Sequence, residues 1–198
     1  MTTAHFYLSH PEVQIDPATP VARWSLSAVG RARVEVASRR PWVRDFARIV
    51  SSHETKALET ATILADAAGV TVEEGEDMGE NDRSATGFLP PDEFENTADA
   101  FFANPHASVR GWERACDAQT RIVRAVRTTL ATRPYDPTLF VGHGGVGTLL
   151  ACAIRGVSID RAHDQGCTPA ANPRGGNLHI FDADLTTAFW GWTAMESL

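Results

Sequence analysis

Two histidines in the sequence directly follow short apolar runs. His10 comes just after the run Phe-Tyr-Leu at residues 6–8, and His143 comes just after Leu-Phe-Val at residues 139–141. Short apolar runs bounded by glycine or proline are typical of buried strands. A histidine at the end of such a strand can attack an electrophile, carry a proton or bind a metal, because its ordinary pKa is about 6.5.

A cation and a carboxylate are expected close to these histidines. A strand expected over 46–50 leads through Ser51-Ser52 to Lys56, the only lysine among 18 basic residues, and Glu80 follows a short strand expected over 70–72. In an open parallel sheet the carboxyl ends of the strands share one edge, where ligands bind. One histidine could attack phosphorus, the lysine and the second histidine could hold the oxygens, and the carboxyl could move the proton. The pattern therefore favours phosphoryl transfer.

The elements that must position these residues alternate along the chain. Strands are expected over 6–8, 46–50, 70–72, 139–141, 177–181 and 189–192. Helices are expected from an N-cap at Ser27 to about residue 38, and over 54–68, 92–103, 109–132 and 146–154. Val29, Val34 and Ala37 should lie on the inner face of the first helix. Alternating strands and helices predict an α/β fold, a three-layer α/β/α sandwich with a mostly parallel central sheet.

The 198 residues predict a single domain, residues 1–198, that contains one long excursion. Residues 73–108 are rich in glycine, proline and phenylalanine, and long loops inside compact domains usually serve as lids or specificity elements. Its aromatic residues, with one that follows it, could line the site or simply belong to the core: Phe88, Phe94, Phe101, Phe102 and Trp112.

Charge and cysteine content narrow the possible partners. The net charge of -7 argues against binding nucleic acid or a membrane surface, since both are anionic. The three cysteines are widely spaced and form no CxxC pair, which indicates a reducing compartment and no zinc site. Because the sequence shows no signal-peptide pattern and no long apolar run, we expect a cytoplasmic protein. The expected partner is a small phosphorylated substrate. The oligomeric state stays open.

Four blocks in the chain resemble those of the histidine phosphatase superfamily, the phosphoglycerate-mutase-like proteins. Residues 9–12 (Ser-His-Pro-Glu) are similar to the family's Arg-His-Gly-Glu, and 51–61 (Ser-Ser-His-Glu-Thr-Lys-Ala-Leu-Glu-Thr-Ala) to its Ser-Ser-x-x-x-Arg-Ala-x-x-Thr-Ala. Residues 141–145 (Val-Gly-His-Gly-Gly) are similar to Val-x-His-Gly-Gly, and 26–30 (Leu-Ser-Ala-Val-Gly) to the helix start Leu-Thr-x-x-Gly. The blocks occur in the family's order over roughly residues 4–150.

The resemblance implies a phosphoglycerate-mutase-like fold and a set of roles. His10 would be the nucleophile that becomes a phosphohistidine, and Glu80 the general acid and base, with Glu76 and Asp77 as nearby competitors. His143 and Lys56 would bind phosphate. Ser9, Asp16, Arg83 and Gly144 complete the candidate substrate-binding residues. The hydrolytic reaction of the family needs no metal and no organic cofactor.

The chain departs from the family pattern at two phosphate ligands. Ser9 and Lys56 stand where the family has arginine, and neither can hold phosphate bidentately as a guanidinium does. One lost charged hydrogen bond is worth roughly 1.5–3 kcal/mol, or about tenfold to a hundredfold in rate. Arg83 is the preferred replacement because it is close to Glu80 in the chain, and Arg23 is the other candidate.

The same residues also allow alternative sites and functions. The spacing of Gly142, Gly144 and Gly147 formally matches a dinucleotide fingerprint, but too little chain follows it to complete that fold. A metal site from His10, His143, Glu80 and Asp16 lacks the spacing of helical ligands. Within the resemblance, a phosphatase is preferred to a mutase because Ser9 and Lys56 weaken the basic pocket that a mutase requires. A degenerate, non-catalytic member that binds a phosphorylated ligand or a partner protein is the remaining alternative.

Overall fold

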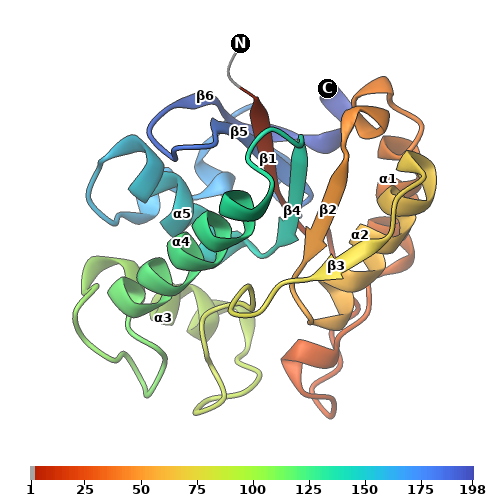
Figure 1. Ribbon diagram of the computed structural model, residues 1–198. Coiled ribbons are helices and arrows are strands. Elements are labelled where there is room, and N and C mark those ends of the chain that lie inside the picture. Colours follow the sequence, from red (N-terminus) through yellow and green to blue (C-terminus); the bar gives the residue numbers. More distant parts are fainter. Residues whose placement is uncertain (1–2) are drawn as a thin grey trace.

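A six-stranded sheet forms the centre of the described chain. The computed structural model describes residues 3–198, except for the side chains of Phe189 and Trp190. The strands are β1 (Ala4–Ser9), β2 (Arg48–Ser51), β3 (Val72–Glu74), β4 (Thr138–Gly142), β5 (Asn177–Asp182) and β6 (Ala188–Ala194). Their order is β3-β2-β4-β1-β5-β6 (Figure 1). The first four run parallel and the last two join antiparallel, which confirms the mostly parallel sheet.

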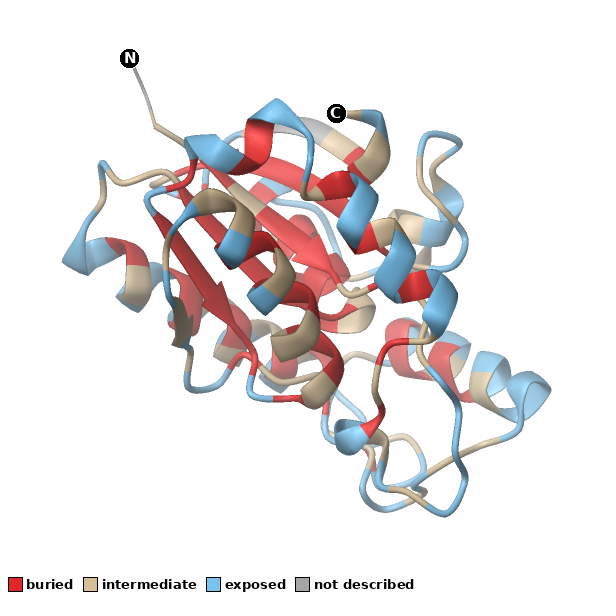
Figure 2. Cartoon of the chain, turned by 90° about the vertical axis from the view of Figure 1, so that its right-hand side faces the viewer, coloured by how far each residue is buried: buried red, intermediate tan, exposed pale blue. Residues whose placement is uncertain are grey.

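Helices cover both faces of this sheet. They are α1 (Ala28–Ala37), α2 (Thr55–Ala68), α3 (Pro91–Ala103), α4 (Ala115–Thr132) and α5 (Gly144–Arg155). Tyr7 and Phe140 join the core under α3, α4 and α5, whereas Leu8 and Leu139 join the core under α1 and α2. This alternation is the two-residue period of a strand buried on both sides. Figure 2 shows most of the sheet buried and the exposed residues on the outer sides of helices and in loops. With helices on both faces of the sheet, the three-layer α/β/α prediction is confirmed.

Local signals in the sequence explain where several helices begin and end. Ser27 is the N-cap of α1, since its side chain accepts the Gly30 N–H at 3.0 Å. Gly69 ends α2 and Gly156 ends α5, both in the left-handed conformation with φ of 75° and 64°. Within residues 3–198, no helix is long and apolar enough to cross a bilayer.

The long fourth helix begins six residues later than predicted. It starts at Ala115 rather than 109, because Arg110 and Gly111 adopt positive φ values of 52° and 83° that interrupt a right-handed helix. Trp112 is nevertheless buried, and its indole N–H donates to the Thr86 hydroxyl at 2.8 Å. The helical hydrophobic period predicted from residue 109 thus includes Trp112, a side chain that a turn buries before the helix begins.

Two strands and one helix face also differ from the prediction. β3 starts at Val72, not 70, because the Val70 N–H still bonds the Ala65 carbonyl at the end of α2. β2 covers 48–51 rather than 46–50, since a 3₁₀ helix over 41–45 runs up to Phe46. Val29 is half exposed and does not lie on the inner face of α1.

The excursion over 73–108 contains the predicted helix, α3, but most of its aromatic residues serve the core. Phe101, Phe102 and Trp112 are buried, and Phe94 packs against the same core. Phe88 is partly buried and lies against Trp24, with 5.9 Å between ring centroids. Of the two interpretations, membership of the core is therefore the one that holds for Phe101, Phe102 and Trp112.

Candidate active site

The structure brings the two predicted histidines together at the carboxyl ends of β1 and β4. These strands are neighbours, with Ser9 in register with Gly142, and the His10 N–H bonds the Gly142 carbonyl at 2.9 Å. The imidazole centroids of His10 and His143 are 5.3 Å apart and the rings are steeply inclined, at 72°. The two histidines thus meet at the carboxyl edge of the parallel strands, as the strand pattern predicted.

His10 is held as a neutral imidazole with one nitrogen unused by the fold. Its Nδ1 lies 2.8 Å from the Pro11 carbonyl oxygen, which can only accept, so Nδ1 carries the hydrogen. Burial, together with nearby His143 and Lys56, lowers the pKa of His10 to about 3. The ring is therefore neutral at pH 7, and the lone pair of Nε2 is available for attack.

His143 is fixed by its backbone and by one ring nitrogen. The Tyr7 hydroxyl accepts the His143 N–H at 2.9 Å and donates to its carbonyl at 3.0 Å. Ring Nε2 lies 2.8 Å from the Ser52 hydroxyl, while Nδ1 is buried without a partner among the described residues. Burial lowers the pKa of His143 to about 4, against the opposing charges of Glu54 and Glu80. An orphaned buried nitrogen beside His10 is the kind of group that a bound anion can satisfy.

Lys56 reaches this region but is paired with a carboxylate. Its side chain is 3% exposed, and Nζ pairs with Glu54 Oε2 and donates to the Val21 carbonyl at 2.9 Å. Glu54 Oε1 lies 3.4 Å from His143 Nε2. Burial acts to raise the pKa of Glu54, but His143, Lys56 and hydrogen bonds outweigh it and bring the pKa to about 2. Glu54 is therefore ionised and neutralises the lysine, a contact that the sequence pattern did not predict.

Glu80 sits at the N-terminus of α5. Its carboxylate accepts the N–H groups of Gly145 at 3.1 Å and Val146 at 2.9 Å, and its own N–H donates to Glu54 Oε1 at 2.8 Å. These contacts satisfy donors that a helix start leaves unpaired. A Cβ at Gly145 would lie 2.8 Å from Glu80 Oε1, so the glycine makes room for the carboxylate.

Ser9 faces the protein rather than open space. It is fully buried, its hydroxyl donates to Gln165 Oε1 at 2.7 Å, and it accepts the Asn177 N–H at 3.1 Å. Gly144, the first residue of α5, lies against the Gln165 side chain. Sequence reasoning missed Gln165 because it lies in a loop 156 residues beyond Ser9, with no motif around it.

The remaining candidates fall into two groups. Arg83 lies close by, with its guanidinium carbon 5.2 Å from the Phe94 ring centroid and 5.6 Å from that of Trp112. Arg23 and Asp16 are exposed, and the Asp16 carboxylate is taken up by the Ala18 N–H and the Thr19 hydroxyl. The structure therefore places Arg83 near the carboxylates and does not place Asp16 or Arg23 with them.

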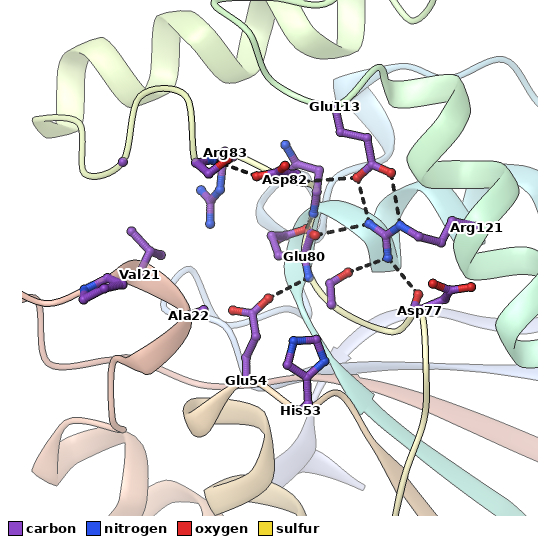
Figure 3. A pocket seen from close by; sticks show the side chains of 15 residues that line it. Val21, Ala22, His53, Glu54, Asp77, Glu80, Asp82, Arg83, Glu113 and Arg121 are labelled. Carbon is purple, nitrogen blue, oxygen red and sulfur yellow. Dashed lines mark hydrogen bonds and ion pairs between the residues drawn. The ribbon is translucent and has the colours of Figure 1, made fainter.

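A cleft of about 670 Å³ contains Glu54 and Glu80 on its walls (Figure 3), whereas His10 and His143 are not among its lining residues. It is lined by Pro20, Val21, Ala22, His53, Glu54, Asp77, Gly79, Glu80, Asn81, Asp82, Arg83, Ser84, Gly87, Glu113 and Arg121. Glu54 and Glu80 belong both to this cleft and to the histidine cluster. On one wall Arg121 pairs with Glu113 at 2.8 Å and donates to the Glu80 carbonyl at 3.2 Å. The start of the excursion therefore forms much of the cleft.

Neither a metal site nor a dinucleotide site is formed by the described residues. No three His, Cys, Asp or Glu side chains within residues 3–198 converge so as to hold a metal ion. Gly142 and Gly147 pack closely against the Tyr7 ring, where a Cβ would collide. Their spacing thus reflects packing of β4 and α5 on β1, and the dinucleotide interpretation loses its basis.

The fold and this sheet edge define an α/β protein of phosphoglycerate-mutase-like architecture, with two histidines, two glutamates and a lysine gathered where its parallel strands end. The family model described as histidine phosphatase superfamily (branch 1) matches residues 20–172, and the chain belongs to this superfamily. The matched region begins beyond His10. Ser9 and His10 therefore lie outside the residues that the family model matches.

Solved structures of the same fold can be superposed on nearly the whole chain. YhfR of Bacillus stearothermophilus superposes with a TM-score of 0.76 at 25% identity, covering 94% of both chains. A mycobacterial glucosyl-3-phosphoglycerate phosphatase gives 0.75 at 19% identity, covering 97% of this chain and 99% of the other. Phosphoserine phosphatase of Entamoeba histolytica gives 0.76 at 14%, covering 99% and 100%. The search of curated protein sequences gives no match.

Proposed function

We propose that the chain hydrolyses a small phosphate monoester through a phosphohistidine on His10. The observation that carries the proposal is the neutral His10 ring, whose Nε2 is left free by the Nδ1 bond to Pro11, beside His143 with its buried unpaired Nδ1. A lone pair and an anion-binding group then lie on the same side of the sheet edge. This arrangement supports in-line attack on a phosphoryl group.

In the first step His10 Nε2 forms a bond to phosphorus while the ester P–O bond breaks. The departing oxygen takes a proton from Glu80, and the phosphoryl group remains on His10. Glu54 also lies in the cluster, but its carboxylate is paired with Lys56. Glu80, the residue to which the family resemblance gives this role, is therefore assigned as the acid.

In the second step water attacks the phosphohistidine and the N–P bond breaks. Glu80, now ionised, accepts the proton of the water, which returns His10 to its neutral form and releases inorganic phosphate. The groups that react in the two steps are His10, Glu80, the substrate and one water molecule.

The phosphate oxygens are assigned to groups around the two rings. A bound dianion would favour the protonated, doubly donating form of His143, because an adjacent negative charge stabilises imidazolium. Lys56 supplies a positive charge only in part, since Glu54 already neutralises it. Arg83 is close enough to the cluster to act on the pKa of His143 and could turn from its aromatic partners to the ligand.

The organic part of the substrate is assigned to the adjacent cleft. The excursion over 73–108 supplies much of the cleft lining, and we propose that it acts as the specificity element of a single domain. The matched phosphatases are named for glucosyl-3-phosphoglycerate and phosphoserine, which are both small phosphorylated compounds. We expect a substrate of that size.

A non-catalytic member that binds phosphorylated ligands is the second candidate. The observation that favours it is the pairing of Lys56 with Glu54 and the occupied hydroxyl of Ser9, which leave the site short of free cationic donors. A mutase would need a still more basic pocket and is less compatible with these contacts.

A phosphate-ester panel that includes p-nitrophenyl phosphate, measured with the natural chain and with His10→Ala, tests the proposal. Turnover that disappears in His10→Ala supports the hydrolase. Absence of turnover on every ester, with retained binding of inorganic phosphate, would favour the non-catalytic candidate.

A further inference from the structure

Gln165 presents an unused amide donor at the sheet edge where His10 and His143 meet. Its Oε1 accepts the Ser9 hydroxyl at 2.7 Å and Asn177 Nδ2 at 2.8 Å. Its Nε2 lies against Gly144 and has no acceptor among the residues that the structure describes. Ser9 precedes His10 and Gly144 follows His143, so this donor lies between the two histidine loops.

The orientation of the Gln165 amide is determined by a chain of hydrogen bonds that begins at the backbone. Asn177 Oδ1 accepts the Asn172 N–H at 2.6 Å, and Asn177 Nδ2 donates to the Asn172 carbonyl at 2.8 Å. Because a backbone N–H only donates and a carbonyl only accepts, the Asn177 amide has one possible orientation. The Gln165 atom that faces Asn177 Nδ2 must then be oxygen.

Ser9 agrees with the orientation that Asn177 sets. Its hydroxyl oxygen accepts the Asn177 N–H at 3.1 Å, and its hydrogen has two acceptors in reach, Gln165 Oε1 at 2.7 Å and the Asn177 carbonyl at 3.3 Å, of which Gln165 is the closer. Two donors therefore converge on Oε1, and the NH₂ group is directed away from them toward Gly144. A Cβ at Gly144 would collide with Nε2, so the glycine leaves the space that this amide occupies.

We propose that Gln165 Nε2 is a phosphate-binding donor of this site, and that Ser9 and Asn177 are the positioning residues that aim it. This inference rests on the proposed function, because it assumes that phosphate binds beside His10. A neutral amide preset by two hydrogen bonds loses little rotamer freedom on binding, which makes one bond to an anion effective. Ser9 thus serves the phosphate through Gln165 rather than by direct contact.

The matched pair Gln165→Glu and Gln165→Leu tests the donor. Gln165→Glu keeps an oxygen for Ser9 and Asn177 and replaces only the NH₂ group with an acceptor. We expect kcat/KM for p-nitrophenyl phosphate to fall about 10- to 100-fold in Gln165→Leu, the effect of one hydrogen bond to a charged group, and further in Gln165→Glu. The affinity for inorganic phosphate, measured by calorimetry, should fall in parallel.

Gln119→Leu is the control for general loss of stability. Gln119 is also partly buried, and its amide donates to the Leu149 carbonyl at 2.9 Å between α4 and α5, away from the site. It should leave kcat/KM and phosphate affinity unchanged. Ser9→Ala should weaken phosphate binding in the natural chain but have little further effect in the Gln165→Leu background, since positioning requires the amide.

The outcomes separate this inference from the proposed function. Turnover that requires His10 but is unchanged by both Gln165 variants would overturn the inference and leave the hydrolase intact. Phosphate binding that requires Gln165 without any turnover would leave the inference standing and remove the hydrolase. Equal losses in Gln119→Leu and Gln165→Leu, or additive effects of Ser9→Ala, would overturn the inference, because the role of these residues would then be structural only.

Discussion

Replacing Glu54 with glutamine should tighten phosphate binding while it destabilises the protein. Glu54 pairs with Lys56 and lies 3.4 Å from His143 Nε2, so it competes with an anion for both groups. Glu54→Gln removes this charge and keeps the shape of the side chain. The amide can still accept the Glu80 N–H that Glu54 Oε1 accepts at 2.8 Å.

The two effects can be given magnitudes from the contacts. If the Glu54 carboxylate and a bound phosphate are about 6 Å apart, two unit charges repel by roughly 3 kcal/mol at an effective dielectric constant of about 20. This upper limit corresponds to about 100-fold in phosphate affinity. We therefore expect inorganic phosphate to bind about 10- to 100-fold more tightly. Without phosphate, Lys56 is left buried and unpaired, which should lower the free energy of unfolding by about 3–5 kcal/mol.

Calorimetry with inorganic phosphate and urea denaturation with and without phosphate measure both effects. Glu113→Gln is the matched control, because Glu113 lines the same cleft but pairs with Arg121 and contacts neither Lys56 nor His143. It should change phosphate affinity much less. Unchanged or weaker phosphate binding in Glu54→Gln would refute the assignment of Lys56 and His143 as phosphate ligands.

Three further predictions concern the supports of the site. Gly145→Ala should displace the Glu80 carboxylate and lower kcat about 100-fold. The free energy of unfolding should change by less than about 1 kcal/mol, because alanine favours helices. An unchanged kcat would contradict the role of Glu80. Tyr7→Phe leaves the buried His143 N–H unpaired and should cost about 1–3 kcal/mol in urea denaturation, and no loss would contradict the hydrogen bond. The pKa values of His10, His143 and His179 are lowered by burial to about 3, 4 and 3. Below the ordinary histidine pKa of about 6.5, the unfolded chain therefore binds more protons than the folded chain. The free energy of unfolding should fall between pH 6.5 and 4, by up to about 1.4 kcal/mol per pH unit for each of these histidines, with no such dependence above pH 7. A free energy of unfolding that stays constant from pH 7 to 5 would contradict the buried neutral rings.

The sequence carried enough information to predict the layers of the fold and the two histidines. Apolar runs identify β1 and β4 because both strands are buried on both sides, and two parallel neighbours necessarily end at one edge. Caps such as Ser27 and Gly69 also have local signals. Boundaries failed where backbone conformation changed without a change in hydrophobic period, as at Arg110 and Gly111 before α4.

The contacts that modify the site could not be predicted from local sequence. Glu54 neutralises Lys56 from two residues away, yet the pairing depends on both side chains being buried beside His143. Gln165 reaches Ser9 only because β5 pairs with β1 and carries Asn177 to the same edge. Such contacts are set by tertiary packing. In the sequence, Ser9 indicated only that the family's arginine is missing at that position.

Trapping the phosphoenzyme tests the central claim most directly. The chain would be mixed with p-nitrophenyl phosphate, quenched in neutral denaturant within the first turnovers, and mapped by mass spectrometry. The account predicts one acid-labile phosphoryl group on the peptide that contains His10, and none in His10→Ala. Turnover that survives in His10→Ala, or a phosphoryl group found on another residue, would contradict it.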